Sequence, residues 1–225
     1  MITLDHVSKR FRHQGADRVV ARDISFAFPL GERVGLLGRN GAGKSTMLKM
    51  LSGLIRPDSG RIHAAGLVSW PVGFAGSFHA DLTGSQNIRF LARLYGLPVR
   101  DACKQARDIS GLGDQIDWPL RQYSAGMKSR LAFAASMLVQ FDTYLVDEIT
   151  AVGDGAFRKR CEAMLSERLK DRNAVIVSHS HEVIERLSTS AVVLEQGRFF
   201  YYRRPAKAIE HYRHLMAGRL PPWLH

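Results

Sequence analysis

The chain has 225 residues, of which 45% are hydrophobic and 24% charged, a balance typical of a globular protein with a full core. No apolar run approaches the roughly 18 residues of a membrane span, and Met1–Asp5 lacks the basic and apolar regions of a signal peptide. Cys103 and Cys161 stand apart, without metal-ligand spacing, as in a reducing compartment. We therefore expect a cytoplasmic protein rather than a secreted or membrane-spanning one.

The formal net charge of +11 is high for this length. It suits an anionic membrane surface, an acidic partner or an acidic polymer equally well, and it also fits a basic surface that is merely solvated. Nucleic-acid binding would call for a basic stripe with aromatic platforms or a known module, and the sequence contains neither. We therefore expect no nucleic-acid partner.

The first thirty residues predict strands, because β-branched and aromatic residues recur in Val19-Val20 and in Ile24–Phe28. A short buried strand is predicted at Arg33–Leu37. A helix is predicted from Lys44 to Leu51, with Gly53 as its cap.

Between this strand and this helix lies a complete G-x-x-x-x-G-K-S/T phosphate-binding loop, in the strand-loop-helix context that the motif requires. Its residues are Gly38, Arg39, Asn40, Gly41, Ala42, Gly43, Lys44, Ser45 and Thr46. The glycines let backbone N–H groups surround phosphates, and the helix N-terminus adds a partial positive charge. Lys44 is predicted to neutralise the β- and γ-phosphates, and Ser45 to offer its hydroxyl to Mg²⁺.

From about residue 84 to 138 the apolar spacing becomes helical, with Ile88, Leu91 and Leu131 among the periodic positions. Beyond residue 142, short β-branched runs alternate with helices, as in a parallel sheet covered on both faces. Together these segments predict an α/β nucleotide-binding core interrupted by a helical insertion. A polar, helix-compatible tail follows at 206–225.

Asp147 and Glu148 follow the apolar strand Tyr144–Val146, roughly a hundred residues after Lys44. In that order after a phosphate loop, Asp147 is predicted to hold Mg²⁺ and Glu148 to polarise the attacking water. Between the two motifs, Tyr123 to Met127 read Tyr-Ser-Ala-Gly-Met ahead of a helix expected to begin near Lys128. Ser124 and the N–H groups of that helix are predicted to bind an anion.

The phosphate loop, the Tyr-Ser-Ala-Gly-Met segment and Asp147-Glu148, in this order, resemble the ATP-binding subunits of ABC transporters over nearly the whole chain. The resemblance implies further roles: Asp154 in the D-loop, His179 as the residue that senses the γ-phosphate, and Phe11 stacked on adenine. It also implies a head-to-tail homodimer with ATP and Mg²⁺ between the copies. Ser124, Ala125 and Gly126 of one chain would then face the γ-phosphate held by Lys44 of the other.

The chain departs from the general pattern of that family. The usual Leu-Ser-Gly-Gly-Gln is Tyr-Ser-Ala-Gly-Met here, Ile149 replaces the proline that commonly follows the catalytic glutamate, and the expected glutamine before the insertion is missing, since Gln86 comes too late. These departures, together with Trp70–Phe74 (Trp-Pro-Val-Gly-Phe) and Val146–Asp154 (Val-Asp-Glu-Ile-Thr-Ala-Val-Gly-Asp), resemble the ATP-binding subunits of capsular polysaccharide exporters. Those of O-antigen and teichoic acid exporters are related.

The resemblance implies a P-loop ABC ATPase core with an antiparallel β part, forming one domain over 1–225 with the helical subdomain inserted at about 84–138. We expect an ATPase, peripheral on the cytoplasmic face of the inner (plasma) membrane. It is expected to power export of a lipid-linked, acidic capsular polysaccharide across that membrane through a separate permease. The permease is expected to dock around residues 70–100, with Phe74, Phe78 and Phe90 as possible contacts or as core residues. Two alternatives stay open: another transported cargo, and an ABC ATPase acting on nucleic acid.

Overall fold

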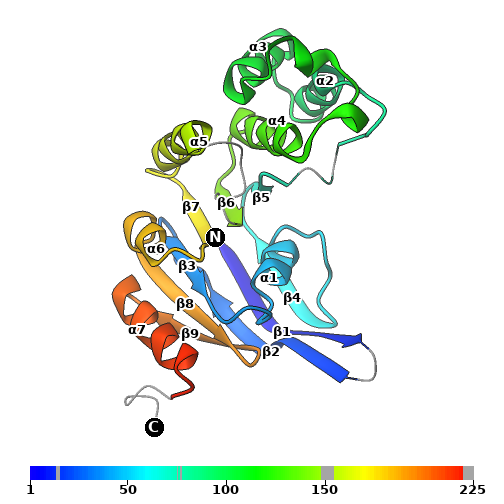
Figure 1. Cartoon of the computed structure of the whole chain (residues 1–225). Coiled ribbons are helices and arrows are strands. Elements are labelled where there is room, and N and C mark those ends of the chain that lie inside the picture. The colour runs from blue at the N-terminus through cyan, green and yellow to red at the C-terminus, as the bar shows by residue number, and fades with distance from the viewer. Residues whose placement is uncertain (14–15, 75, 77, 148–154, 220–225) are drawn as a thin grey trace. The chain divides into compact units, whose positions relative to one another are not determined.

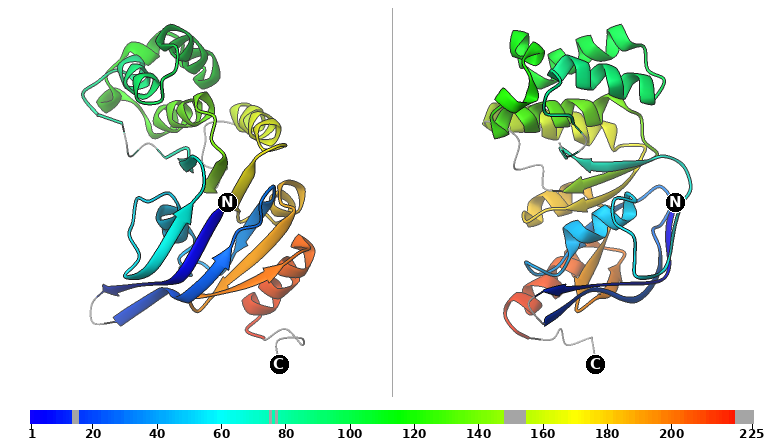
Figure 2. Two further views of the ribbon diagram at one scale, coloured as in Figure 1. Left: turned by 180° about the vertical axis from the view of Figure 1, so that it is seen from behind. Right: turned by 90° about the vertical axis from the view of Figure 1, so that its right-hand side faces the viewer.

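The structure is a computed structural model that describes residues 1–13, 16–74, 76, 78–147 and 155–219. The chain divides into two units. The first comprises Met1–Pro71, Phe141–Glu148 and Arg168–His225, and the second comprises Val72–Gln140 and Ile149–Glu167. Figure 1 shows the path of the chain through its helices and strands, and Figure 2 shows the same elements from two further sides. Because the first unit is assembled from three stretches, its sheets combine strands from distant parts of the sequence.

The larger sheet has the strand order β5-β6-β7-β3-β8-β9. Its strands are β3 (Arg33–Leu37), β5 (Val68–Val72), β6 (Thr143–Asp147), β7 (Asn173–Val177), β8 (Ser190–Glu195) and β9 (Arg198–Tyr202). Strand β3 pairs in parallel with β7 and β8, β6 pairs in parallel with β7, and β9 closes the edge antiparallel to β8. The short apolar runs predicted as buried parallel strands are therefore confirmed.

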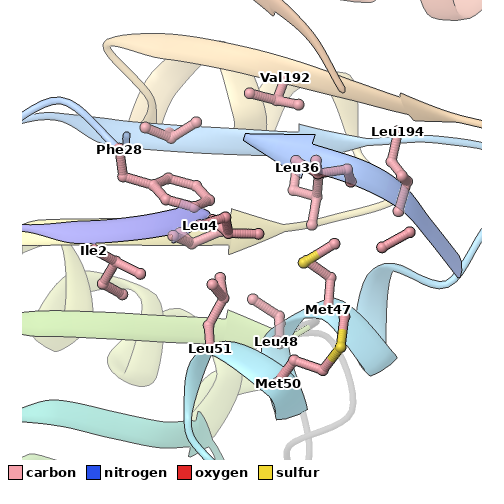
Figure 3. Packing of buried hydrophobic residues seen from close by; sticks show 14 of the residues in the cluster. Ile2, Leu4, Phe28, Leu36, Met47, Leu48, Met50, Leu51, Val192 and Leu194 are labelled. Carbon is pink, nitrogen blue, oxygen red and sulfur yellow. The ribbon is translucent and has the colours of Figure 1, made fainter. Parts of the chain in front are cut away.

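A second sheet is antiparallel, with the order β2-β1-β4, formed by β1 (Ile2–His13), β2 (Ala16–Ala27) and β4 (Ser59–Ala64). Helix α1 (Lys44–Leu51) lies between the two sheets. Figure 3 shows Met47, Leu48 and Leu51 of this helix directed toward apolar side chains of β1, β3 and β8. The predicted helix is confirmed over its whole length. Its C-cap is Ser52, and Gly53, with φ +77°, is the next residue.

The other face of the larger sheet is covered by α6 (His181–Leu187) and α7 (Pro205–Met216), as Figure 1 shows. Alternation along β3 explains this: Leu36 faces the core around α1, whereas Gly35 faces α6. A Cβ at Gly35 would lie 2.9 Å from Cγ2 of Ile184, so glycine allows α6 to approach the strand closely. Both faces are covered, which accounts for the nearly continuous apolar character of the strands. In the predicted tail, α7 begins at Pro205, and residues 220–225 lie outside the described residues.

The second unit is mainly helical. Its elements are α2 (Gly84–Leu94), α3 (Val99–Ser110), η1 (Gly113–Asp117), η2 (Leu120–Gln122), α4 (Ala125–Leu138) and α5 (Gly155–Arg168). The rings of Phe133 on α4 and Phe157 on α5 pack edge to face, 6.4 Å apart. Helices α2, α3 and α4 lie within the predicted 84–138 span. The exact domain boundaries stay a prediction. None of the helices in the described part of the chain is long and apolar enough to cross a membrane.

Two details of the second unit differ from the sequence-based expectations. Helix α4 begins at Ala125 rather than near Lys128, because Ser124 is its N-cap. The predicted start was wrong because Gly126, a poor helix former, made the first turn look like a loop. Gln86 belongs to a capping box at the start of α2, where its side chain accepts the N–H of Thr83 at 2.9 Å. Its role in α2 is therefore a helix cap.

Candidate functional site

The phosphate loop connects the buried strand β3 to α1 in the first unit. Gly41 and Gly43 have φ values of +84° and +105°, which glycine adopts without the clash that a Cβ would cause. Gly43 is the N-cap of α1, and no side chain of the described residues caps this helix. Its first N–H groups therefore need other partners, and phosphate oxygens are suitable acceptors.

Lys44 is only 9% exposed, so its ammonium group is enclosed by the loop. Its Nζ donates hydrogen bonds to the carbonyl oxygens of Gly38 at 2.7 Å and Arg39 at 3.2 Å. Burial lowers the pKa of Lys44, and the nearby carboxylate of Asp147 partly opposes this change. A desolvated ammonium that has only neutral carbonyl partners in this loop is well suited to accept a phosphate anion.

Asp147 is the last residue of β6, and its backbone pairs with Val177 at the end of β7. Strands β6, β7 and β3 are parallel neighbours, so their carboxyl ends lie at one edge of the sheet. The phosphate loop leaves the same edge after Leu37. Because ligands in α/β folds bind beyond the carboxyl ends of the strands, Asp147 is correctly placed to act with the loop.

His179 comes two residues after the end of β7, at this same edge, and is exposed. The turn that carries it is fixed by local hydrogen bonds. The N–H of Ser180 donates to Oγ of Ser178 at 3.1 Å, and Oγ of Ser180 accepts the N–H of Val183 at 3.4 Å as the N-cap of α6. The edge of the sheet therefore brings together the phosphate loop, Asp147 and His179, three of the predicted site elements.

Phe11 lies on β1 and is 38% exposed, directly opposite Arg18 on β2. The ammonium of Lys9 lies 5.2 Å from the centre of the Phe11 ring. Arg18 in turn donates from Nε to the carbonyl oxygen of Gly41 at 3.0 Å, and its Nη2 contacts the same oxygen. Phe11, the aromatic residue predicted to stack on a base, is thus the cross-strand partner of the residue that contacts the phosphate loop.

Ser124 belongs to the second unit, where it caps α4 by accepting the N–H of Met127 at 3.2 Å. Ser124 and Ala125 are exposed, and Ala125 and Gly126 form the first turn of the helix. A Cβ at Gly126 would have only Oγ of Ser124 near it, at 3.8 Å. The exposed helix N-terminus with its serine is therefore an anion-binding group that lies open on the surface of its unit.

The family model described as ABC transporter matches residues 21–151, more than half of the chain. The chain belongs to the ABC transporter family.

Relatives in this family, among them the following two, match nearly the whole chain. The capsule polysaccharide export ATP-binding protein CtrD of Neisseria meningitidis serogroup B is 43% identical over 96% of this chain and 100% of its own length. The polysialic acid transport ATP-binding protein KpsT of Escherichia coli is 39% identical over 95% of this chain and 96% of its own. The predicted resemblance to the capsule exporter branch of the ABC family is thereby confirmed.

The fold of this ABC protein is also found among solved structures. A dimeric, post-hydrolysis form of the ATP-binding cassette MJ0796, bound to ADP and Pi, superposes with a TM-score of 0.76 at 19% identity. The match covers 90% of this chain and 98% of the other. The predicted fold class, an ABC ATPase core with an antiparallel β part and a helical insertion, is therefore confirmed.

Two predicted site residues of the ABC motifs, Glu148 and Asp154, lie outside the described residues, as does Ile149. The segment in which the family carries the missing glutamine is described up to Phe74. It ends in a turn at Gly73, which has a φ of +84° and donates its N–H to Oγ of Ser136 at 3.5 Å. None of the described residues 68–74 has a side-chain amide.

The site also contains residues that the sequence did not single out. Arg18 contacts the phosphate loop, and Val20, two residues further along β2, lies against Gly43. The only sequence signal for them was the β-branched run that predicted strand β2. The β-branched run predicts that β2 is a strand, but it does not predict which of its side chains face the phosphate loop.

The hydroxyl of Ser45 and the carboxylate of Asp147 are oxygen donors of the kind that Mg²⁺ prefers. Ser45 is exposed, and Asp147 is partly buried at the carboxyl end of β6. Among the described residues there is no group of three or more His, Cys, Asp or Glu that would form a complete protein cage. One hydroxyl and one carboxylate fit an ion that would take its remaining ligands from phosphates and water.

Proposed function

We propose that the chain is the ATP-hydrolysing subunit of an ABC transporter that powers export of a capsular polysaccharide through a separate permease. The observation that carries the proposal is the match to CtrD along the full length of that capsule polysaccharide export protein. The phosphate loop at the edge of the larger sheet, with its buried Lys44 and with Asp147 nearby, provides the groups that nucleotide chemistry needs.

In the proposed reaction, Lys44 and the N-terminal N–H groups of α1 bind the β- and γ-phosphates of ATP. Ser45 and Asp147 would hold Mg²⁺, which supplies charge neutralisation at the phosphates when bound. Glu148 polarises the attacking water, and His179 contacts the γ-phosphate from the end of β7. Phe11 stacks on the adenine ring. Each of these groups acts by position or charge, as phosphoryl transfer requires.

The active site is proposed to be complete only in a homodimer. Ser124, Ala125 and Gly126 are exposed or half-buried at the start of α4, where they are accessible to a second copy. In a head-to-tail dimer they would contact the γ-phosphate held by Lys44 of the other copy, with Asp154 near the interface. The phosphate charge then attracts both surfaces, and hydrolysis removes that attraction.

Contact with the permease is proposed for the exposed side of α2, within the 70–100 region. Phe90 is 64% exposed and Leu94 is 65% exposed, and they lie four residues apart on one helix. Arg89 and Arg93 are exposed beside them. Of the two interpretations of Phe90, a core position is thus excluded by its exposure. An apolar pair flanked by arginines suits an amphipathic segment with acidic residues.

The cargo is proposed to be acidic and lipid-linked. The polysialic acid named for KpsT is an acidic polymer, and the net charge of +11 on this chain is compatible with a negatively charged cargo or membrane surface. No nucleic-acid partner is proposed. The subunit would lie peripherally on the cytoplasmic face of the inner membrane, held there by its permease.

The decisive experiment replaces the native gene with Glu148→Gln and stains the surface and the interior of the cells for polysaccharide. Loss from the surface with accumulation inside is expected, because the variant binds ATP without activating the water. Glu185→Gln, at an exposed position on α6, is the matched control and should leave the surface coat unchanged. An intact coat in Glu148→Gln cells would refute the proposed cargo, while ATPase assays of the purified protein would test the chemistry separately.

A further inference from the structure

We propose that Arg18 is a positioning residue for ATP binding, which acts through Gly41 to hold the phosphate loop and the aromatic side chain of Phe11 as one recognition unit. This inference rests on the proposed ATP-binding function and adds a residue that none of the nucleotide-binding motifs includes.

The first observation is the contact itself. Arg18 directs two donors, Nε and Nη2, at a single acceptor, the carbonyl oxygen of Gly41 in the phosphate loop. Hydrogen bonds from a charged donor are stronger than neutral ones, and a two-pronged contact also fixes direction. The guanidinium group lies close enough that a Cβ on Gly41 would be 3.4 Å from Nη2. The contact therefore fixes the position of the outer part of the loop.

The second observation is the cross-strand neighbour of Arg18. Arg18 and Phe11 are directly opposite in the β1–β2 pair, so their side chains project from the same face of the sheet. Phe11 is itself held by the ammonium of Lys9, which donates to Oδ1 of Asp58 at 2.7 Å. Any shift of Arg18 along β2 would move both the loop contact and the base contact.

The third observation is that β2 touches the loop twice. Val20 of the same strand packs where a Cβ of Gly43 would lie, and Arg18 binds Gly41. Alternate residues of the strand thus contact alternate residues of the loop. At the other side of the loop, Lys44 holds the carbonyls of Gly38 and Arg39. The loop is therefore restrained from both sides before a nucleotide arrives, which reduces the entropy lost on binding.

The test measures ATP affinity and steady-state ATPase activity of the purified full-length chain carrying Arg18→Ala, Arg18→Lys, Phe11→Ala or Phe11→Ala with Arg18→Ala. Arg18→Ala should weaken ATP binding about 5- to 10-fold and raise KM more than it lowers kcat. Arg18→Lys should recover part of the loss, because one ammonium replaces only part of the two-pronged contact. If Phe11 and Arg18 act as one unit, the double variant should lose less ATP affinity than the two single-variant fold-losses multiplied together.

The matched control is Arg22→Ala, which removes the same charge from an exposed position on the same strand. Its ATP affinity should be within about twofold of that of the wild type. Such a result would show that the loss in Arg18→Ala is not a general effect of removing a positive charge. Two results would overturn the proposal: an ATP affinity of Arg18→Ala equal to that of the wild type, or single losses that multiply exactly in the double variant. A wild-type chain that binds no ATP would instead refute the proposed function.

Discussion

A Cβ atom placed on Gly43 would lie 2.6 Å from Cγ1 of Val20, which is closer than two carbon atoms can approach without displacement. Val20 is almost completely buried on β2, and its other methyl group would be 3.0 Å away. The end of the phosphate loop is therefore packed directly against the antiparallel sheet. Glycine is required at position 43 for two reasons: its φ of +105° disfavours other residues, and Val20 leaves no space for a side chain.

We predict that Gly43→Ala destabilises the protein more than Gly53→Ala does. Gly53 also has a positive φ, +77°, but nothing lies within 4 Å of a Cβ built there. Gly53→Ala should therefore cost only the conformational strain, about 1–2 kcal/mol. Gly43→Ala adds the clash with Val20, for a total of about 2–5 kcal/mol. Urea unfolding of the two variants measures the difference, and equal losses would show that the loop moves away from Val20 without cost.

The phosphate loop was predictable because its determinants are local. The glycines, Lys44 and the apolar pattern of α1 all lie within about twenty residues of sequence. Positive φ angles at Gly41 and Gly43 confirm the backbone conformation that the motif implies. Asp147 was singled out because it comes at the end of a short apolar run after the phosphate loop, and His179 was singled out only by the resemblance to ABC proteins. The structure places Asp147 at the end of β6 and His179 two residues after β7, at the same edge of the sheet.

The contact of Arg18 with Gly41 was not predictable from the sequence. It joins residues 23 positions apart, and it depends on which face of β2 each side chain takes. The pairing of β1 with β2 shifts its register at three places, between Leu4 and Val7, between Val7 and Lys9, and between Lys9 and Arg10. Each shift changes the side of the sheet on which later residues lie, so strand alternation alone gives no reliable assignment.

We predict that Lys44→Ala weakens ATP binding about 10- to 100-fold, the loss expected for a charged hydrogen-bonding partner, about 1.5–3 kcal/mol. The variant removes the counter-charge of the phosphates and also the two hydrogen bonds that hold the loop at Gly38 and Arg39. Isothermal titration with ATP measures the change. Lys49→Ala, in the last turn of the same helix, is the control and should bind ATP normally. Unchanged affinity in Lys44→Ala would remove Lys44 from its proposed role.

We predict that Ser124→Arg abolishes hydrolysis while each monomer still binds ATP with nearly wild-type affinity. The large, charged side chain would block contact of the α4 N-terminus with a second copy, whereas the loop that binds ATP belongs to the other unit. Losing the cap also costs about 1 kcal/mol of stability. Thr83→Ala, which removes the N-cap of α2, is the matched control for that cost and should retain hydrolysis. An equal loss of ATP binding in Ser124→Arg would contradict a contact between copies.

His211 on α7 is fully buried between the rings of Phe200 and Tyr202. Its Nδ1 shares a hydrogen bond of 2.9 Å with the hydroxyl of Tyr202, and its Nε2 lies 3.6 Å from Oε2 of Glu195. Burial lowers the pKa of His211, the Glu195 carboxylate opposes this, and the charge of His214 lowers it further. The neutral imidazole is therefore the form that the folded core accommodates.

We predict that this histidine makes the protein less stable as the pH falls below about 6.5, the pKa of a histidine in the unfolded chain. Below that value the unfolded chain binds the proton more readily than the folded one, so the stabilisation present above pH 6.5 decreases until the lower folded-state pKa is reached. The loss is at most about 1.4 kcal/mol per pH unit. Urea unfolding at pH 7.5 and pH 5.5 should show a smaller decrease for His211→Gln than for the wild type.

His6 provides the opposite case for comparison. His6 is exposed, and its hydrogen bond to Asp23, at 2.8 Å, raises its pKa. Its contribution to the stability of the folded protein is therefore fully present below about pH 6.5 and is lost as the pH rises through the pKa of the folded state. His6→Gln should therefore steepen the decrease towards pH 5.5, whereas His211→Gln should flatten it. If His211→Gln left the slope unchanged, the proton would be accommodated by pairing with Glu195, and the buried imidazole would not control the acid stability of this unit.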